Sequence, residues 1–139
     1  MVENRTTRID RLKELCYSLY MSYDTDSYKE AVFVFAELNI ELCDLRFKFR
    51  KNEARRKQQE RLYIEKYKDD NLYKSDAKCK AKFEADNIDK MFKFRILRWE
   101  VEHFEWILES YKLELDWIKS AEIDRKHENK MSNTLPIKT

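Results

Sequence analysis

The residues best suited to acid–base or metal chemistry are two histidines and several acidic pairs at helical spacing. The segment Glu100-Val101-Glu102-His103 places a carboxylate and an imidazole three residues apart, on one face of a helix. Other acidic pairs stand four apart, at Glu37 and Glu41 and at Glu105 and Glu109. A carboxylate-bridged metal site in a helical bundle needs two Glu-x-x-His motifs, and this chain has one. We therefore interpret His103 as a packed or interfacial histidine.

Other catalytic motifs are absent from the sequence. The chain contains no glycine, so a glycine-rich phosphate loop cannot form, and no HExxH or nucleophile motif occurs. His127 lies near an expected helix end and should be solvated. We expect no catalytic residue, no metal ligand and no cofactor, and hence a protein that is not an enzyme.

Charge is unevenly distributed along the chain. Residues 46–98 carry eighteen basic and nine acidic side chains, a net charge of +9, whereas residues 1–45 and 99–128 carry −4 and −5. Dense Lys and Arg can contact phosphates, although charged helix faces are often merely solvated. Arg55, Arg56 and Lys57 are expected to face solvent. The candidate contacts to an anionic partner are Arg50, Lys51, Arg55, Arg56, Lys57 and Arg61.

Residues 94–118 carry apolar side chains on two nearly opposite faces of a predicted helix. One face is a seam with steps of three and four, the spacing of helices that pack lengthwise: Phe94, Leu97, Val101, Phe104, Leu108, Tyr111, Leu115 and Ile118. The other face, the outer stripe, consists of Ile96, Trp99, His103, Trp106, Leu113 and Trp117. Three exposed tryptophans would form a large apolar patch. The outer stripe is therefore predicted to be a partner or oligomer interface.

A second long segment repeats this two-faced pattern. Its seam is Ala31, Phe35, Leu38, Leu42, Leu45 and Phe49, and a further face carries Phe33, Ala36, Ile40, Cys43 and Phe47. The two long segments are expected to be partners. A first helix of about 15 residues spans roughly 22 Å, too short to cover the roughly 32 Å from Ile96 to Trp117. Self-association into a homodimer or larger oligomer is therefore expected.

The fold class predicted from these patterns is all-α. Glycine is absent and Pro136 is the only proline, which leaves few turn signals. We expect three helices over residues 6–21, 27–68 and 76–127, forming a long antiparallel, coiled-coil-like hairpin with the shorter N-terminal helix against its acidic half. Thr6 or Thr7, a Ser27–Glu30 capping box and Ser75 or Asp76 would begin the helices, with a turn at 69–71. Residues 1–128 are predicted to form one domain, followed by a flexible tail over 129–139.

The cysteines and the hydropathy pattern indicate the cellular compartment in which the protein is expected. Cys16, Cys43 and Cys79 are odd in number, lack metal-ligand spacing and follow no signal peptide, which favours reduced thiols in the cytoplasm. The longest apolar run, residues 31–36, is far too short to span a bilayer. We expect a soluble cytoplasmic protein with no membrane partner.

Three segments carry a resemblance to a known group of proteins. They are a capped start with interleaved Lys and Ala over residues 75–81, and Glu-rich segments with regular aromatic residues over 99–104 and 113–120. Over roughly residues 60–125 the chain resembles small helical-hairpin proteins of tailed bacteriophages. The resemblance implies a location in the host cytoplasm and a place among replication and recombination genes, and it implies no functional residue.

These observations favour a non-enzymatic, oligomeric helical binding protein of phage type that acts through protein contacts, as an accessory to replication or recombination. Its expected partners are further copies of itself and an unidentified protein. One alternative is an inhibitor of a host enzyme or defence system. A third is nucleic-acid binding through the basic arm of the predicted hairpin, which carries Arg50, Lys51, Arg55, Arg56, Lys57 and Arg61.

Overall fold

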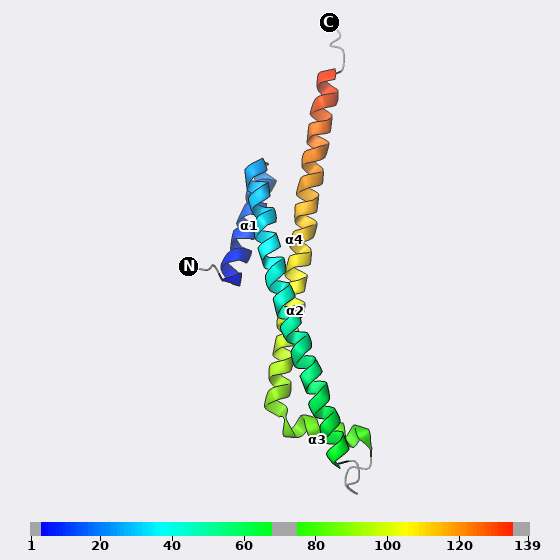
Figure 1. Ribbon diagram of the computed structural model, residues 1–139. Helices are drawn as coiled ribbons and strands as arrows, with labels where there is room; N and C mark the ends of the chain where they lie inside the picture. The colour runs from blue at the N-terminus through cyan, green and yellow to red at the C-terminus, as the bar shows by residue number, and fades with distance from the viewer. Residues whose placement is uncertain (1–3, 68–74, 135–139) are drawn as a thin grey trace. The chain divides into compact units, whose positions relative to one another are not determined.

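The computed structural model describes residues 4–67 and 75–134, which form four α-helices (Figure 1). The helices are α1 (Arg5–Met21), α2 (Thr25–Tyr67), α3 (Asp76–Asp86) and α4 (Ile88–Thr134). No β-strand occurs in these two ranges, which confirms the all-α fold class. The predicted number of three helices is wrong.

The extra helix arises because the segment predicted as one helix over 76–127 is divided at Asn87. Asn87 has φ −120° and ψ 36°, outside the helical region. Its backbone N–H and its side-chain amide both donate to the carbonyl oxygen of Phe83, at 3.0 and 2.9 Å. Its own carbonyl accepts from the N–H of Met91 at 2.9 Å, which begins α4. Asparagine favours such breaks because its side chain competes for backbone hydrogen bonds.

The other helix ends differ from the expected positions by a few residues. Asn4 caps α1 by accepting the N–H of Thr7 at 2.8 Å. The carboxylate of Asp24 accepts both the backbone N–H and the hydroxyl of Ser27, at 3.1 and 2.8 Å, so α2 begins at Thr25. The predicted start of α2 at a Ser27 cap is therefore wrong.

At the remaining ends, one expected cap is present and one helix is longer than predicted. Ser75 caps α3 by accepting the N–H of Lys78, as predicted. α4 continues to Thr134, so residues 129–134 of the predicted tail are helical. Residues 135–139 and the predicted turn at 69–71 lie outside the described residues.

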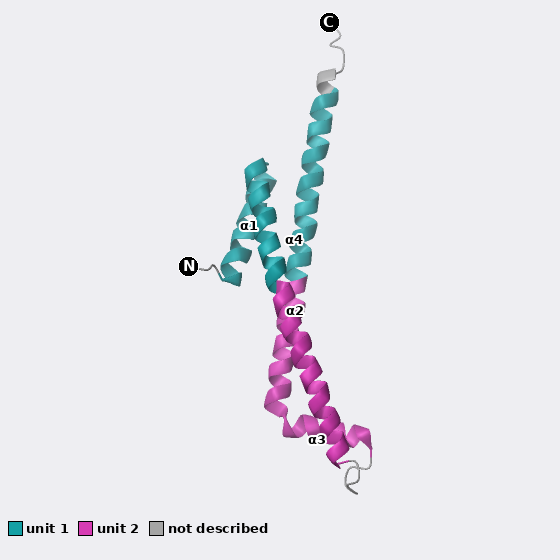
Figure 2. Ribbon diagram, in the orientation of Figure 1, with its two compact units in different colours: residues 1–41, 106–139 teal, residues 42–105 magenta. Residues whose placement is uncertain are grey.

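The chain forms two compact units (Figure 2). Unit 1 comprises residues 1–41 and 106–139, and therefore α1, the beginning of α2 and the later part of α4. Unit 2 comprises residues 42–105, with the rest of α2, α3 and the beginning of α4. The single domain predicted over 1–128 stays a prediction.

The core of unit 1 is formed by one apolar face from each of its helices. The buried side chains are Leu12, Cys16 and Leu19 of α1, Ala31, Val34 and Leu38 of α2, and Leu108, Leu115 and Ile118 of α4. Ion pairs also join α1 to α2. Arg5 and Arg8 contact the carboxylate of Glu41 at 3.0 and 3.3 Å, and Arg11 pairs with Glu30. Both apolar and charged contacts thus hold α1 against acidic residues of α2.

The core of unit 2 is formed by the same two seams together with α3. Leu42, Cys79, Phe83, Met91, Val101 and Phe104 are buried. The rings of Phe49 and Phe94 stack with their centroids 5.2 Å apart, and Arg46 pairs with Glu105 at 2.8 Å. At α3, the hydroxyl of Tyr63 donates to the carboxylate of Asp86 at 2.7 Å. Aromatic and ionic contacts therefore join α2 to the other two helices of this unit.

Candidate functional site

The outer stripe of α4 is exposed along its whole length. In unit 1 its members are Trp106, Leu113 and Trp117, with 67%, 63% and 59% of their surface exposed. In unit 2 Ile96, Trp99 and His103 are exposed as well. These side chains alternate with buried seam residues on the same helix, so the outer stripe lies on a different face of α4 from the seam. That the stripe is a partner interface stays a prediction.

In unit 1 this stripe joins aromatic residues of α1. The rings of Tyr20 and Trp117 lie 5.3 Å apart between centroids, and Tyr17 is exposed on the same face of α1, one turn before Tyr20. We call this set the aromatic surface: Tyr17, Tyr20, Trp106, Leu113 and Trp117. α1 therefore contacts the stripe but leaves most of it open to solvent.

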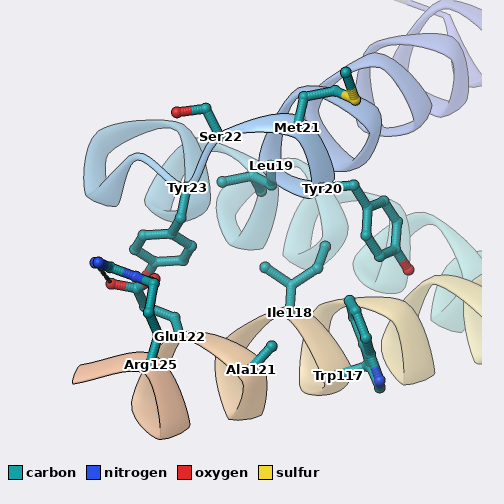
Figure 3. A pocket seen from close by; sticks show the side chains of 10 residues that line it. All are labelled: Leu19, Tyr20, Met21, Ser22, Tyr23, Trp117, Ile118, Ala121, Glu122 and Arg125. Atoms are coloured by element: carbon teal, nitrogen blue, oxygen red, sulfur yellow. Dashed lines mark hydrogen bonds and ion pairs between the residues drawn. The ribbon is translucent and has the colours of Figure 1, made fainter. Parts of the chain in front are cut away.

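Two hollows of unit 1 are lined in part by Tyr20. The first, about 500 Å³, is formed by the end of α1, the following turn and α4 (Figure 3). An ion pair between Glu122 and Arg125, at 2.7 Å, lies at its edge. The second, about 520 Å³, is lined by Tyr17, Tyr20 and Trp106 together with further residues of α1 and α4. Such hollows beside exposed rings can accept side chains of a partner.

The thiol of Cys16 and the phenols of Tyr20 and Tyr111, in and beneath the aromatic surface, are held in their neutral forms. Burial, reinforced by the nearby carboxylate of Glu114, raises the pKa of the Cys16 thiol to about 11. The same two causes raise the pKa values of Tyr20 and Tyr111. A buried thiol with a raised pKa is a poor nucleophile, so Cys16 acts here as a packing residue.

The histidine singled out from the sequence lies in unit 2 and stacks on a neighbouring tryptophan. The His103 and Trp99 rings are nearly parallel, with a 4° interplanar angle and a centroid distance of 5.0 Å. Over residues 4–67 and 75–134, no group of three or more His, Cys, Asp or Glu side chains is arranged to hold a metal ion. His103 thus belongs to the exposed stripe.

The basic residues of unit 2 line a groove between α2 and the start of α4. This basic groove, about 380 Å³, has cationic, carboxamide and apolar side chains in its walls: Asn52, Arg55, Arg56, Gln59, Phe83, Asn87, Lys90, Met91, Lys93 and Phe94. Of the six residues predicted to contact an anion, Arg55 and Arg56 line it. Arg50, Lys51, Lys57 and Arg61 lie elsewhere on the exposed surface of α2.

Arg56 differs from its expected solvent-facing position. Its guanidinium carbon lies 4.7 Å from the centroid of the Phe94 ring, and its Nη1 donates to Glu60 at 3.2 Å. Its Nε is buried and has no hydrogen-bond partner. Arg56 therefore forms part of the groove wall, because a guanidinium can stack on an aromatic ring while its charge stays paired.

Five of the basic side chains in the described part of unit 2 form ion pairs, and many others do not. Arg46, Arg56, Lys57, Lys82 and Arg98 form ion pairs. Over the described residues of this unit, no ion pair is formed by Lys48, Arg50, Lys51, Arg55, Arg61, Lys66, Lys78, Lys80, Lys90, Lys93 or Arg95. Of these cations, Arg55, Lys90 and Lys93 line the basic groove.

On the second face of α2, Phe33, Ile40 and Phe47 are 66%, 65% and 70% exposed. The contribution of Tyr17 and Tyr20 to the aromatic surface was missed. Their spacing from buried Cys16 and Leu19 was the available signal, since neighbours one position along a helix point about 100° apart.

Comparisons with protein-family models, with curated proteins and with solved structures found no match for this chain. No helix in the described part of the chain is long and apolar enough to cross a membrane.

Proposed function

We propose that this protein is a non-enzymatic helical binding protein that associates with a second copy of itself through the aromatic surface of unit 1. The observation that carries the proposal is the exposure of Trp106, Leu113 and Trp117 after α1 has packed against α4. Large apolar side chains gathered on one face of a soluble protein usually mark an interaction site. Trp and Tyr are also the residues that contribute most to binding at interfaces.

The spacing of these residues favours a helix as the occupant. Trp106 and Leu113 stand seven residues apart, and Ser110 and Trp117 follow them at steps of four, which is the pattern of lengthwise helix packing. The chain's own α1 is already engaged through Leu12, Cys16 and Leu19. A second copy of α4 presents a self-complementary face, as a two-fold symmetric interface requires.

The proposal includes the antiparallel, coiled-coil-like pairing of α2 with α4 that the two seams predict. Within unit 2, the Arg46–Glu105 ion pair and the Phe49–Phe94 ring stack support this pairing. The expected role as a phage accessory to replication or recombination fits an oligomeric protein of this kind, and rests on the resemblance alone.

Sedimentation equilibrium at micromolar concentration tests the proposal. The wild-type protein should sediment above its monomer mass of 17.2 kDa. Trp106→Glu should shift the equilibrium toward monomer, because it places a charge in an apolar interface without a partner. Glu109→Lys, on the same helix but outside the aromatic surface, is the control and should sediment like wild type.

Two results would count against the proposal. A wild-type protein that remains monomeric at high micromolar concentration would exclude self-association as its function. Equal dissociation by Trp106→Glu and Glu109→Lys would show that net charge, and not the aromatic surface, governs assembly.

A further inference from the structure

We propose that the basic groove of unit 2 binds single-stranded nucleic acid, with the phosphates held by its cations and a base held by its carboxamides. This activity is separate from the proposed self-association, which uses residues of unit 1. Three features of the groove support this binding: its positive charge, its mixture of polar and apolar lining residues, and the fixed position of Arg56.

The charge of the groove suits an anion. Arg55, Lys90 and Lys93 line it and form no ion pair within the described residues of unit 2. Among the residues that the structure describes, no aspartate or glutamate lines the groove to neutralise them. Lys48 and Lys51, which also form no ion pair within the described residues of unit 2, lie on α2 before the groove. A polyanion would gain contacts beyond the groove itself, which favours a nucleic-acid strand over a single small anion.

The remaining lining suits a base as well as a phosphate. Asn52, Gln59 and Asn87 offer both donors and acceptors, which can pair with the edges of an unstacked base. Phe94 is already covered by Phe49 and Arg56, at 5.2 and 4.7 Å from its centroid, so the carboxamides would supply the contacts to the base. Bases are presented in this way by single strands and not by a duplex, whose base edges lie inside its grooves.

Arg56 is already fixed in the groove wall. Stacking on Phe94 and the contact with Glu60 hold its guanidinium in place, so binding would cost it little further rotamer entropy. The flexible side chains of Arg55, Lys90 and Lys93 would then supply the adjustable phosphate contacts.

The salt dependence of this binding follows from the number of phosphates that the groove neutralises. Each phosphate neutralised on a single strand lowers log K by about 0.7 per decade of salt. For three groove contacts, raising salt from about 50 to about 200 mM should therefore weaken binding roughly 20-fold, before contacts outside the groove are added.

The test is fluorescence anisotropy with a labelled oligothymidine of about 20 nucleotides, longer than the roughly 4–16 nucleotides that a single-strand binding site typically covers. We expect binding at low salt, with a slope of log K against log salt concentration of about −2 or steeper. A duplex of equal length should bind more weakly. The variant Arg55→Glu, Lys90→Glu, Lys93→Glu should bind at least roughly tenfold more weakly. Its slope of log K against log salt concentration should be less steep by about 2.

A matched control separates the groove from general positive charge. The variant Lys78→Glu, Lys80→Glu, Arg95→Glu reverses three exposed cations of the same unit that do not line the groove. It should retain most of the affinity. If the groove variant loses its helical circular dichroism, the glutamine versions at the same three positions replace it and should show the same loss.

Three outcomes would overturn the inference: no binding of oligothymidine at low salt, equal loss in the groove and control variants, or duplex binding as tight as single-strand binding. Salt-sensitive self-association without nucleic acid, abolished by the groove variant, would also overturn it. In that case the groove would hold an acidic segment of a second copy.

Discussion

Replacing leucine by alanine at two positions of α4 in unit 1 compares its buried and exposed faces directly. Leu108 is 3% exposed and lies in the seam, whereas Leu113, five residues later, is 63% exposed. Truncating a buried leucine loses its transfer free energy and leaves a cavity, so Leu108→Ala should lower the free energy of unfolding by about 2–5 kcal/mol. The identical change at Leu113 should cost far less.

The expected cost at Leu113 follows from its exposure. Fully burying a leucine contributes about 1.5–3 kcal/mol, and roughly a third of this side chain is covered, so the loss should be at most about 1 kcal/mol. The higher helix propensity of alanine offsets a few tenths of that. Urea denaturation followed by far-UV circular dichroism, at a concentration where the protein is monomeric, measures both values. Equal costs at the two positions would refute the assignment of faces.

At high protein concentration the two variants should differ in another way. Self-association stabilises the folded chain by mass action, so the unfolding midpoint of wild type should rise with concentration. Leu113→Ala should weaken this rise because Leu113 belongs to the aromatic surface. Leu108→Ala should lower the midpoint at every concentration and leave its concentration dependence close to that of wild type.

Two further predictions concern titratable groups. A thiol reagent at mildly alkaline pH should modify exposed Cys43 first and reach buried Cys16 only on unfolding; similar rates at both would contradict the burial of α1. The hydrogen bonds from Ser27 hold the pKa of Asp24 below its usual value, so their contribution to stability is present above about pH 4 and is lost as the pH falls further. Asp24→Asn should reduce this acid dependence, as measured by thermal unfolding across pH.

The seams of both long helices were predictable because a buried face leaves a strong periodic signal. Leu38, Leu42, Val101, Phe104 and Leu108 are all buried, as their spacing indicated. The exposure of the outer faces was not predictable from spacing, since a sequence pattern shows that a face is apolar but not whether a partner from the same chain covers it.

The features that sequence reasoning missed depend on local competition and on tertiary contacts. Asp24, and not Ser27, caps α2, because the carboxylate of Asp24 accepts hydrogen bonds from both the backbone N–H and the hydroxyl of Ser27. Asn87 breaks a segment with otherwise continuous helical periodicity. Arg56 lies in a solvated stretch of sequence, and only the approach of Phe94 from α4 draws it into the basic groove.

Collisional quenching of Trp106 tests the central proposal most directly. A variant with Trp99→Phe and Trp117→Phe leaves Trp106 as the only tryptophan, and its ring is 67% exposed in the single chain. If the aromatic surface joins two copies, the acrylamide quenching constant of Trp106 should fall as protein concentration rises through the association range measured by sedimentation. A quenching constant that stays unchanged while the protein associates would show that assembly uses another surface.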